Sequence, residues 1–338
     1  MKELVKIKNR SALRRELFGL IDTTINNLKF PQRPATLYDP IRYTLNSGGK
    51  RIRPYLTLLS CGMMGGNTSD ALYAASAIEL LHNFTLVHDD IMDKAEIRRG
   101  KPTVHKKWDE ATAILVGDYL FAKSFDLINY YGEQTWISKR QYVQLHQHFL
   151  KGVKIVCEGQ VRDMELEKAD NARLDDYLDM ISCKTSALLS SSLQLGGIIA
   201  DCDQHSLKYL GSIGVEIGNA FQIQDDLLDI TGNPDLFGKT IGGDIKARKK
   251  TYLSILAFKR ANKFQKQKLL RIFNDDYVDN NHLMEIVDIY DTLGVTDDAK
   301  RAISFHYESA IELIDVFDES TYKMTLLSLL KKLINRKS

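Results

Sequence analysis

Apolar side chains recur every three to four positions along most of the chain, which is the period of an amphipathic α-helix. Strand-like alternation of apolar and polar residues is absent. Only six prolines occur in 338 residues, and no Pro-, Gly- or Ser-rich linker marks a boundary. The sequence therefore predicts an all-α fold in a single domain, 1–338. The expected helices span residues 11–28, 36–47, 52–64, 69–94, 109–131, 138–168, 174–200, 205–231, 250–262, 264–274, 282–293, 297–316 and 320–335.

Two of these helices contain aspartates among apolar neighbours. The first contains Asp89, Asp90 and Asp93, and the second contains Asp225, Asp226 and Asp229. Aspartate is a poor helix former, and a carboxylate beside apolar side chains stays ionised only when a cation meets it. In each helix the first and last aspartates are four positions apart, so they point from one face. Two such faces turned toward each other would form a cage of hard oxygen ligands suited to Mg²⁺ and phosphate groups.

The pattern Asp-Asp-x-x-Asp alone is weak evidence, because the chain contains four copies. The copy that begins at Asp175 follows a polar stretch and is interpreted as a solvated helix start. The copy that begins at Asp275 lies among asparagines, which is typical of a turn. The copies at 89 and 225 lack turn signals and are surrounded by apolar residues. We therefore expect only these two copies to bind metal.

Basic residues flank both metal-binding candidates. Lys50 and Arg53 follow two glycines at the predicted start of a helix, where an anion is favoured, although an exposed basic turn is the alternative. Arg98 and Arg99 follow Asp93 closely and can each hold phosphate oxygens.

The segment after the second acidic helix, residues 232–240, resembles a phosphate-binding nucleotide loop. It has five residues between its glycines instead of four and follows a helix, so the nucleotide interpretation is rejected. The segment is instead expected to bring Lys239, and after it Lys249, toward the second group of aspartates. Acids for Mg²⁺ and bases for phosphate, both in duplicate, predict a substrate rich in negative charge.

Composition narrows the alternatives further. A net charge of +2 without aromatic residues in the basic clusters argues against nucleic acid as a partner. The four cysteines are far apart and fit reduced thiols in the cytoplasm. The longest uncharged stretch, 185–200, contains four serines and is too short and polar for a membrane span. Its small side chains indicate close helix packing or room for a slender apolar substrate. We expect a soluble cytoplasmic protein without a membrane span.

Taken in order, these motifs resemble the signature of the trans-isoprenyl (polyprenyl) diphosphate synthases. The segments concerned are Gly48–Pro54, His88–Asp93, Arg98–Gly100, Lys184–Thr185 and Phe221–Asp229. The resemblance implies an isoprenoid-synthase-type helical bundle around a central cavity, in a protein that is usually a homodimer. It also implies a prenyltransferase that condenses isopentenyl diphosphate with an allylic diphosphate, in a 1'-4 head-to-tail reaction.

The same resemblance implies a role for each motif residue. About three Mg²⁺ ions per active site would be held by Asp89, Asp90, Asp93, Asp225, Asp226 and Asp229. The allylic diphosphate would be bound by Arg98, Lys184, Thr185, Gln222, Lys239 and Lys249. Isopentenyl diphosphate would be bound by Lys50, Arg53, His82 and Arg99. The catalytic groups would be Lys184, Thr185 and Gln222, the last two stabilising the allylic carbocation, and the released diphosphate would take the proton.

The resemblance also suggests that the residues just before the first aspartates set the product length. Phe84 lies five residues before Asp89, about 7.5 Å along the axis at ~1.5 Å per residue. An aromatic residue there, followed by Thr85, resembles archaeal-type geranylgeranyl diphosphate synthases and favours a C20 product. The alternatives are a C15 farnesyl or C25 product, with Phe84 as an ordinary core residue.

Three other functions remain as alternatives. A terpene cyclase shares the implied fold but needs neither a second Asp-Asp-x-x-Asp nor the Gly-Gly-Lys site. A helical His-Asp metal phosphohydrolase needs another histidine well upstream of His88, whereas the only earlier one is His82 in the same helix. A non-catalytic partner subunit would not need the complete set of acidic and basic residues.

Overall fold

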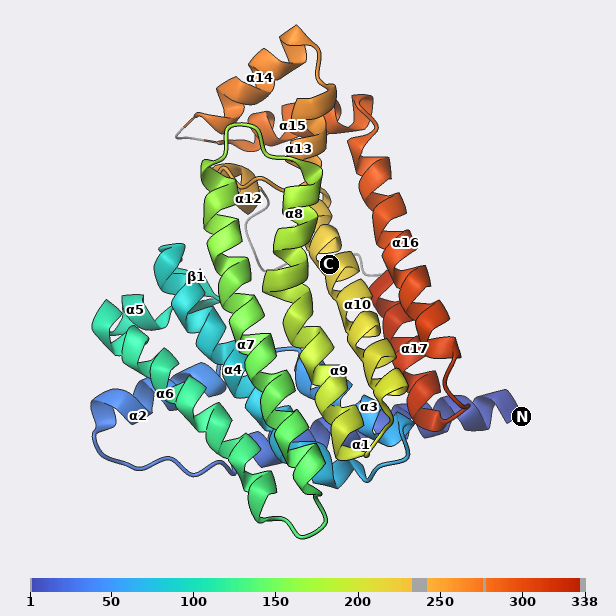
Figure 1. Cartoon of the computed structure of the whole chain (residues 1–338). Coiled ribbons are helices and arrows are strands. Elements are labelled where there is room, and N and C mark those ends of the chain that lie inside the picture. Colours follow the sequence, from blue (N-terminus) through green and yellow to red (C-terminus); the bar gives the residue numbers. More distant parts are fainter. Residues whose placement is uncertain (1, 233–241, 276–277, 335–338) are drawn as a thin grey trace. The chain divides into compact units, whose positions relative to one another are not determined.

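The structure, a computed structural model, describes residues 2–232, 242–275 and 278–334. Helices form nearly all of the regular structure there (Figure 1), which confirms the all-α prediction. The longer helices are α1 (Lys2–Asn26), α2 (Ala35–Leu45), α3 (Ile52–Met63), α4 (Leu72–Met92), α6 (Glu110–Asn129), α7 (Lys139–Lys168), α8 (Leu174–Ile181), α9 (Ala187–Ile199), α10 (Gln204–Thr231), α13 (Tyr252–Arg260), α14 (Lys263–Phe273), α15 (Asn280–Thr292), α16 (Val295–Asp315) and α17 (Thr321–Ile334).

Short elements connect the helices. They are the 3₁₀ turns η1 (Thr68–Ala71) and η2 (Tyr130–Glu133), the short helices α5 (Val104–Lys107) and α12 (Gly243–Lys246), and the strands β1 (Ile97–Arg98) and β2 (Lys101–Pro102). The two strands pair antiparallel, with Arg98 opposite Lys101. This ribbon follows the first aspartates directly. Among the described residues, no helix has the length and apolar character needed to cross a membrane.

Contacts within the chain define two compact units. Unit 1 comprises Met1–Val153, Leu188–Gly211 and Ile314–Ser328, and unit 2 comprises Lys154–Ala187, Ser212–Leu313 and Leu329–Ser338. Two of the changes from one unit to the other fall inside α7 and α10, not in a linker. The expectation of a single domain stays a prediction.

In unit 1, α4 packs against α3 and α6 and forms the centre of the core. Ile78 and Leu80 of α4 are fully buried, as are Val116 and Leu120 of α6. A side chain at Gly117 would place its Cβ 2.1 Å from Nε2 of His88. Only glycine permits α6 to approach the end of α4 this closely, and that contact fixes the helix that contains the first aspartates.

In unit 2, the part of α10 that contains the second aspartates packs deep in the core. Ile223 is fully buried, and the Gln224 side chain donates to the backbone oxygen of Leu333 at 2.8 Å. The Tyr307 hydroxyl donates to Gln224 Oε1 at 3.2 Å. A buried amide that is bonded on both sides holds α10 to α16 and α17, so the aspartates stand on a rigid support.

The predicted helix 174–200 is not continuous. It consists of α8, a π-helical segment η3 (Ser182–Ser186) and α9. The apolar periodicity of the sequence does not reveal this interruption, because a single wide helical turn hardly changes the pattern. Helix α1 also begins at Lys2, nine residues before the expected start.

Candidate active site

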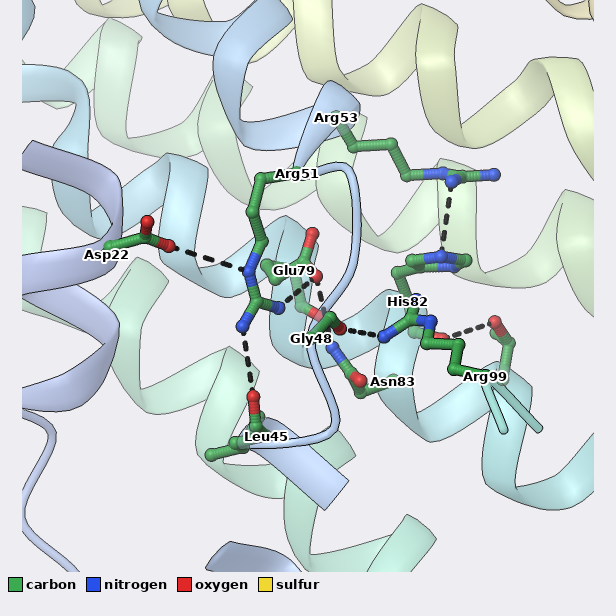
Figure 2. Close-up of polar contacts among 10 residues, drawn as sticks. Asp22, Leu45, Gly48, Arg51, Arg53, Glu79, His82, Asn83 and Arg99 are labelled. Carbon is green, nitrogen blue, oxygen red and sulfur yellow. Dashed lines mark hydrogen bonds and ion pairs between the residues drawn. The ribbon is translucent and has the colours of Figure 1, made fainter. Parts of the chain in front are cut away.

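The glycine loop before α3 lies against Arg99, one of the two arginines that follow the first aspartates (Figure 2). Gly48 and Gly49 have φ angles of 80° and 145°, which other residues rarely adopt. Arg99 Nη1 donates to the backbone oxygen of Gly48. A Cβ on Gly49 would lie 2.9 Å from Nη1 of Arg99. The structure therefore brings together two basic clusters that are about 50 residues apart.

His82 joins this cluster from α4. Its Nε2 lies 3.2 Å from Nη1 of Arg53 (Figure 2). Burial lowers the pKa of His82 well below 6.5, and the positive charges of Arg53 and Arg99 lower it further. The imidazole is therefore neutral at neutral pH, and its Nε2 is able to accept a hydrogen bond from the Arg53 guanidinium.

In the first aspartate group, the middle carboxylate is the buried one. Asp90 is 4% exposed and accepts a hydrogen bond from Nε of Arg98 at 2.7 Å. Burial raises the pKa of Asp90, and the guanidinium of Arg98 opposes this rise. Asp89 is half-buried and Asp93 is exposed. The backbone N–H of Asp93 bonds to the oxygen of Asp89 at 2.8 Å, so α4 ends inside the motif.

The second group also buries its middle carboxylate, but with different partners. Asp226 accepts hydrogen bonds from the Tyr177 hydroxyl at 2.6 Å, from Gln222 Nε2 at 3.0 Å and from the Tyr252 N–H at 3.2 Å. Burial, together with the charge of Asp244, raises the pKa of Asp226 to about 7. Asp225 and Asp229 on either side are half-buried.

The π-helical segment presents Lys184 and Thr185. Lys184 Nζ forms an ion pair with Asp163 of α7 at 2.5 Å. The Thr185 hydroxyl donates to Gln222 Oε1 at 2.9 Å, and the Gln222 amide in turn donates to Asp226. A Cβ at Gly159, one turn before Asp163, would lie 2.3 Å from the backbone nitrogen of Lys184. Helix α7 thus holds the bulge by a backbone contact and by an ion pair.

The remaining predicted residues have clear positions, with one exception. The Phe84 ring meets His88 edge to face and lies tilted against Phe121, with ring centroids 4.8 and 5.5 Å away. The Thr85 hydroxyl donates to the His82 backbone oxygen at 2.8 Å. Lys50 is exposed and Lys249 is half-buried. Lys239 lies outside the described residues, so its predicted role stays a prediction.

Three residues that the sequence did not suggest hold predicted site residues, or in one case the neighbour of two of them, in place. Tyr177 belongs to the motif copy interpreted as a solvated helix start, yet its hydroxyl bonds to Asp226. Asp163 pairs with Lys184. Glu79, a single acid in an apolar helical run, forms an ion pair with Arg51 at 2.5 Å. The position of Glu79 among apolar residues was the one available signal, because a buried carboxylate requires a partner.

Residues 34–290 match the family model described as polyprenyl synthetase. The chain belongs to the polyprenyl synthetase family. The match extends over every site residue predicted above, from Lys50 to Lys249. It confirms the family predicted from the motifs, and with it the class of enzyme, a trans-prenyltransferase.

Relatives of this polyprenyl synthetase are similar over most of their length. A geranylgeranyl diphosphate synthase of Methanosarcina mazei is 35% identical over 98% of this chain and 97% of the relative. A short chain isoprenyl diphosphate synthase of Methanocaldococcus jannaschii is 38% identical over 86% of each chain. The crystal structure of geranylgeranyl pyrophosphate synthetase from Pyrococcus horikoshii superimposes with a TM-score of 0.85 at 36% identity, over 99% of both chains.

Proposed function

We propose that the chain is a Mg²⁺-dependent prenyltransferase that condenses isopentenyl diphosphate with an allylic diphosphate to give all-trans C20 geranylgeranyl diphosphate. One observation supports this most directly. Each aspartate group buries its middle carboxylate in hydrogen bonds and leaves the outer two, one helix turn apart, more accessible. Relatives named geranylgeranyl synthases over nearly the whole chain support the C20 product.

The outer aspartates are the proposed ligands of about three Mg²⁺ ions. Within the described residues, no three acidic, His or Cys side chains converge to form a metal site. This agrees with the coordination of Mg²⁺, which usually takes one or two carboxylates and completes its shell with substrate phosphates and water. Asp90 and Asp226 have a different role, because they orient Arg98 and Gln222 through the hydrogen bonds described above.

The basic cluster around the glycine loop is the proposed site of isopentenyl diphosphate. Arg53, Arg99 and the neutral imidazole of His82 lie around a loop that ends at a helix N-terminus. Guanidinium groups bind diphosphate oxygens in a bidentate manner, and Lys50 adds a point charge. Arg98, Lys184, Lys239 and Lys249 are assigned to the allylic diphosphate.

The proposed chemistry begins with loss of the allylic diphosphate. Bound Mg²⁺ supplies electrostatic stabilisation of the charge that develops on this leaving group. Arg98 and Lys184 bind the same oxygens and so lower the cost of separating charge. The Thr185 and Gln222 oxygens direct their dipoles at the allylic carbocation, which the isopentenyl double bond attacks. The released diphosphate takes the proton, and apolar side chains exclude the water that would quench the cation.

Phe84 is assigned to the floor of the prenyl cavity. Its ring packs against Phe121 of α6, with ring centroids 5.5 Å apart, so two aromatic side chains from adjacent helices support this assignment. We assign the enzyme to the cytoplasm as a homodimer. The exposed apolar side chains Ile114 and Leu115 on α6, which are 43% and 59% accessible, support a contact between copies there.

Incubation of the purified protein with isopentenyl diphosphate and each of the C5, C10 and C15 allylic primers, followed by product sizing, tests this proposal. A C20 product that requires Mg²⁺ and disappears with chelator is expected. A cyclic hydrocarbon would instead identify a terpene cyclase, and inorganic phosphate without prenyl transfer a phosphohydrolase. Inactivity of the purified protein on every primer would indicate a partner subunit.

A further inference from the structure

We propose that the buried Arg51–Glu79 ion pair is a positioning device that sets the shape of the glycine loop, and that neither side chain contacts diphosphate. The inference rests on the proposed function, since it assigns these two residues to the isopentenyl diphosphate site. Arg51 lies between two predicted ligands, Lys50 and Arg53, so a simple reading of the sequence would add it to them. The structure separates it from them.

The Arg51 guanidinium is enclosed by the protein. Arg51 is 9% exposed and Glu79 is 2% exposed. Arg51 Nη1 donates to Glu79 Oε1 at 2.5 Å, and its Nη2 donates to the oxygen of Leu45 at 2.9 Å. Its Nε lies 3.8 Å from the Asp22 carboxylate. The residue at the N-terminus of α3 is thereby fastened to α1, α2 and α4, and Figure 2 shows these contacts converging on one guanidinium.

The backbone of Arg51 has a left-handed conformation. Its φ is 48° and its ψ is 33°. A residue with a Cβ rarely occupies this region, so surrounding contacts must hold it there. The turn directs Arg51 into the protein while Arg53, two positions later, extends toward His82 (Figure 2). The contacts of Arg51 thus decide where the adjacent cations point.

Helix α4 fixes both arginines from one face. Glu79, His82 and Asn83 are three and four positions apart, which places them on the same side of the helix. Asn83 Nδ2 donates to the backbone oxygen of Glu79 at 2.7 Å and lies 3.3 Å from the carboxylate oxygen Oε1 of the same residue. Glu79 holds Arg51, and His82, about one turn later, holds Arg53. The spacing of the two arginines is therefore set by the spacing of Glu79 and His82 along a rigid helix.

Positioning and plain electrostatics predict opposite results for one substitution. Glu79→Gln removes a negative charge and leaves only the more distant Asp22 carboxylate to compensate Arg51, so electrostatics alone predicts tighter anion binding. If the pair positions the loop, the same change releases Arg51, misplaces Arg53 and weakens anion binding.

The test measures binding of inorganic pyrophosphate to the purified full-length protein by calorimetry in EDTA, which requires no prenyl transfer. We expect Glu79→Gln to weaken pyrophosphate binding about tenfold. Arg51→Lys keeps the positive charge but loses the paired donors of the guanidinium, and it should weaken binding about threefold. In turnover assays the KM for isopentenyl diphosphate rises similarly, while the KM for the allylic substrate stays within about threefold.

Two further variants separate positioning from loss of stability. Lys323 is 3% exposed, and its ammonium donates to the Phe317 backbone oxygen at 2.8 Å and forms an ion pair with Glu319 at 2.9 Å. Lys323→Met therefore also removes a buried charge and its ion pair, but in α17 and not at the glycine loop. It should melt earlier and bind pyrophosphate normally. In an Arg53→Met background, the effect of Glu79→Gln should shrink to less than about twofold, because the pair acts through Arg53.

Tighter or unchanged pyrophosphate binding in Glu79→Gln or Arg51→Lys would overturn the inference, as would a full Glu79→Gln effect in the Arg53→Met background. A wild-type protein that binds pyrophosphate but forms no prenyl product would instead refute the proposed function. The two failures are therefore distinguishable.

Discussion

Helices α4 and α10 contain the same Asp-Asp-x-x-Asp pattern, yet their middle carboxylates are stabilised differently. In α4, Asp90 bonds to a cation, Arg98. In α10, Asp226 bonds to a tyrosine hydroxyl, an amide and a backbone N–H, all neutral, with the charge of Asp244 nearby. The local sequence is therefore a poor guide to the electrostatic state of the site, which is set by side chains from other segments.

The comparison has a consequence near neutral pH. Burial raises the pKa of both middle carboxylates, but the Arg98 guanidinium opposes the rise at Asp90, whereas the pKa of Asp226 reaches about 7. Protonation of Asp226 removes a negative charge beside the outer aspartates, so acid should weaken Mg²⁺ binding at the second group before it does so at the first. Substitution of an outer aspartate, in contrast, should lower turnover to a similar extent in either group.

The largest expected effect is loss of an outer aspartate from either helix. Asp89→Ala and Asp225→Ala should each lower turnover by on the order of 10³, because a preorganised charge stabiliser is removed. The matched control is Asp175→Ala in the exposed first turn of α8, which should stay within about twofold of wild type. Turnover within tenfold of wild type in both active-site variants would refute the metal assignment.

A smaller effect should distinguish the two middle carboxylates. Tyr177→Phe removes a hydrogen bond that lowers the pKa of Asp226, so the carboxyl becomes easier to protonate. The Mg²⁺ concentration for half-maximal activity should rise on the order of tenfold at pH 6.5, as for a shift of one pKa unit, and less at pH 8.

Tyr55→Phe is the control for that substitution. The Tyr55 hydroxyl of α3 is buried and has no hydrogen-bond partner among the described residues, so its removal should leave the Mg²⁺ requirement unchanged. If the two tyrosine variants responded equally, protonation of Asp226 would not be the cause of the pH dependence.

The apolar surroundings of the first aspartates should affect product length without greatly affecting rate. Phe84→Ala removes one of the two rings assigned to the cavity floor, so products longer by one or more C5 units should appear by chromatography. Phe264→Ala, which truncates a 65% exposed ring, should leave the distribution unchanged. An unaltered product ladder in Phe84→Ala would show that cavity depth is set elsewhere.

The smallest effect concerns stability without metal. The pKa of Asp226 is about 7 in the folded protein, against 3.8 for an ordinary aspartate. Between these values the folded protein retains a proton that the unfolded chain has lost, so the free energy of unfolding falls as pH rises.

This contribution is complete below about pH 4 and is lost as pH rises through about 7, with each pKa unit worth about 1.4 kcal/mol. Melting curves in EDTA should therefore shift down by a few degrees across this range, and Asp226→Asn should flatten the dependence. An identical pH dependence in wild type and variant would contradict the raised pKa.

Much of the fold follows from residue periodicity. Helix α10 was expected at 205–231 and spans Gln204–Thr231, because a long amphipathic pattern leaves little choice. The π-helical segment was not predicted. It depends on the contact of Gly159 with the backbone of Lys184, which joins segments distant in sequence.

The site was predictable only in part, for a related reason. Acidic and basic motifs identified the residue types, because buried charge among apolar residues is costly without a function. Their partners were not visible, since Tyr177, Asp163 and Glu79 come from other helices or earlier turns. Tyr177 was even assigned to a solvated helix start, because the acidic residues beside it are indeed exposed.

The glycine at position 159 limits how this enzyme can be diversified. With a Cβ only 2.3 Å from the neighbouring backbone, even alanine would push the bulge away and move Lys184 and Thr185 together. Randomised libraries that seek new prenyl products should therefore leave codon 159 fixed while varying the rest of α7. Libraries that also vary codon 159 would contain many inactive clones. Their loss of activity would then be attributed wrongly to the other substitutions.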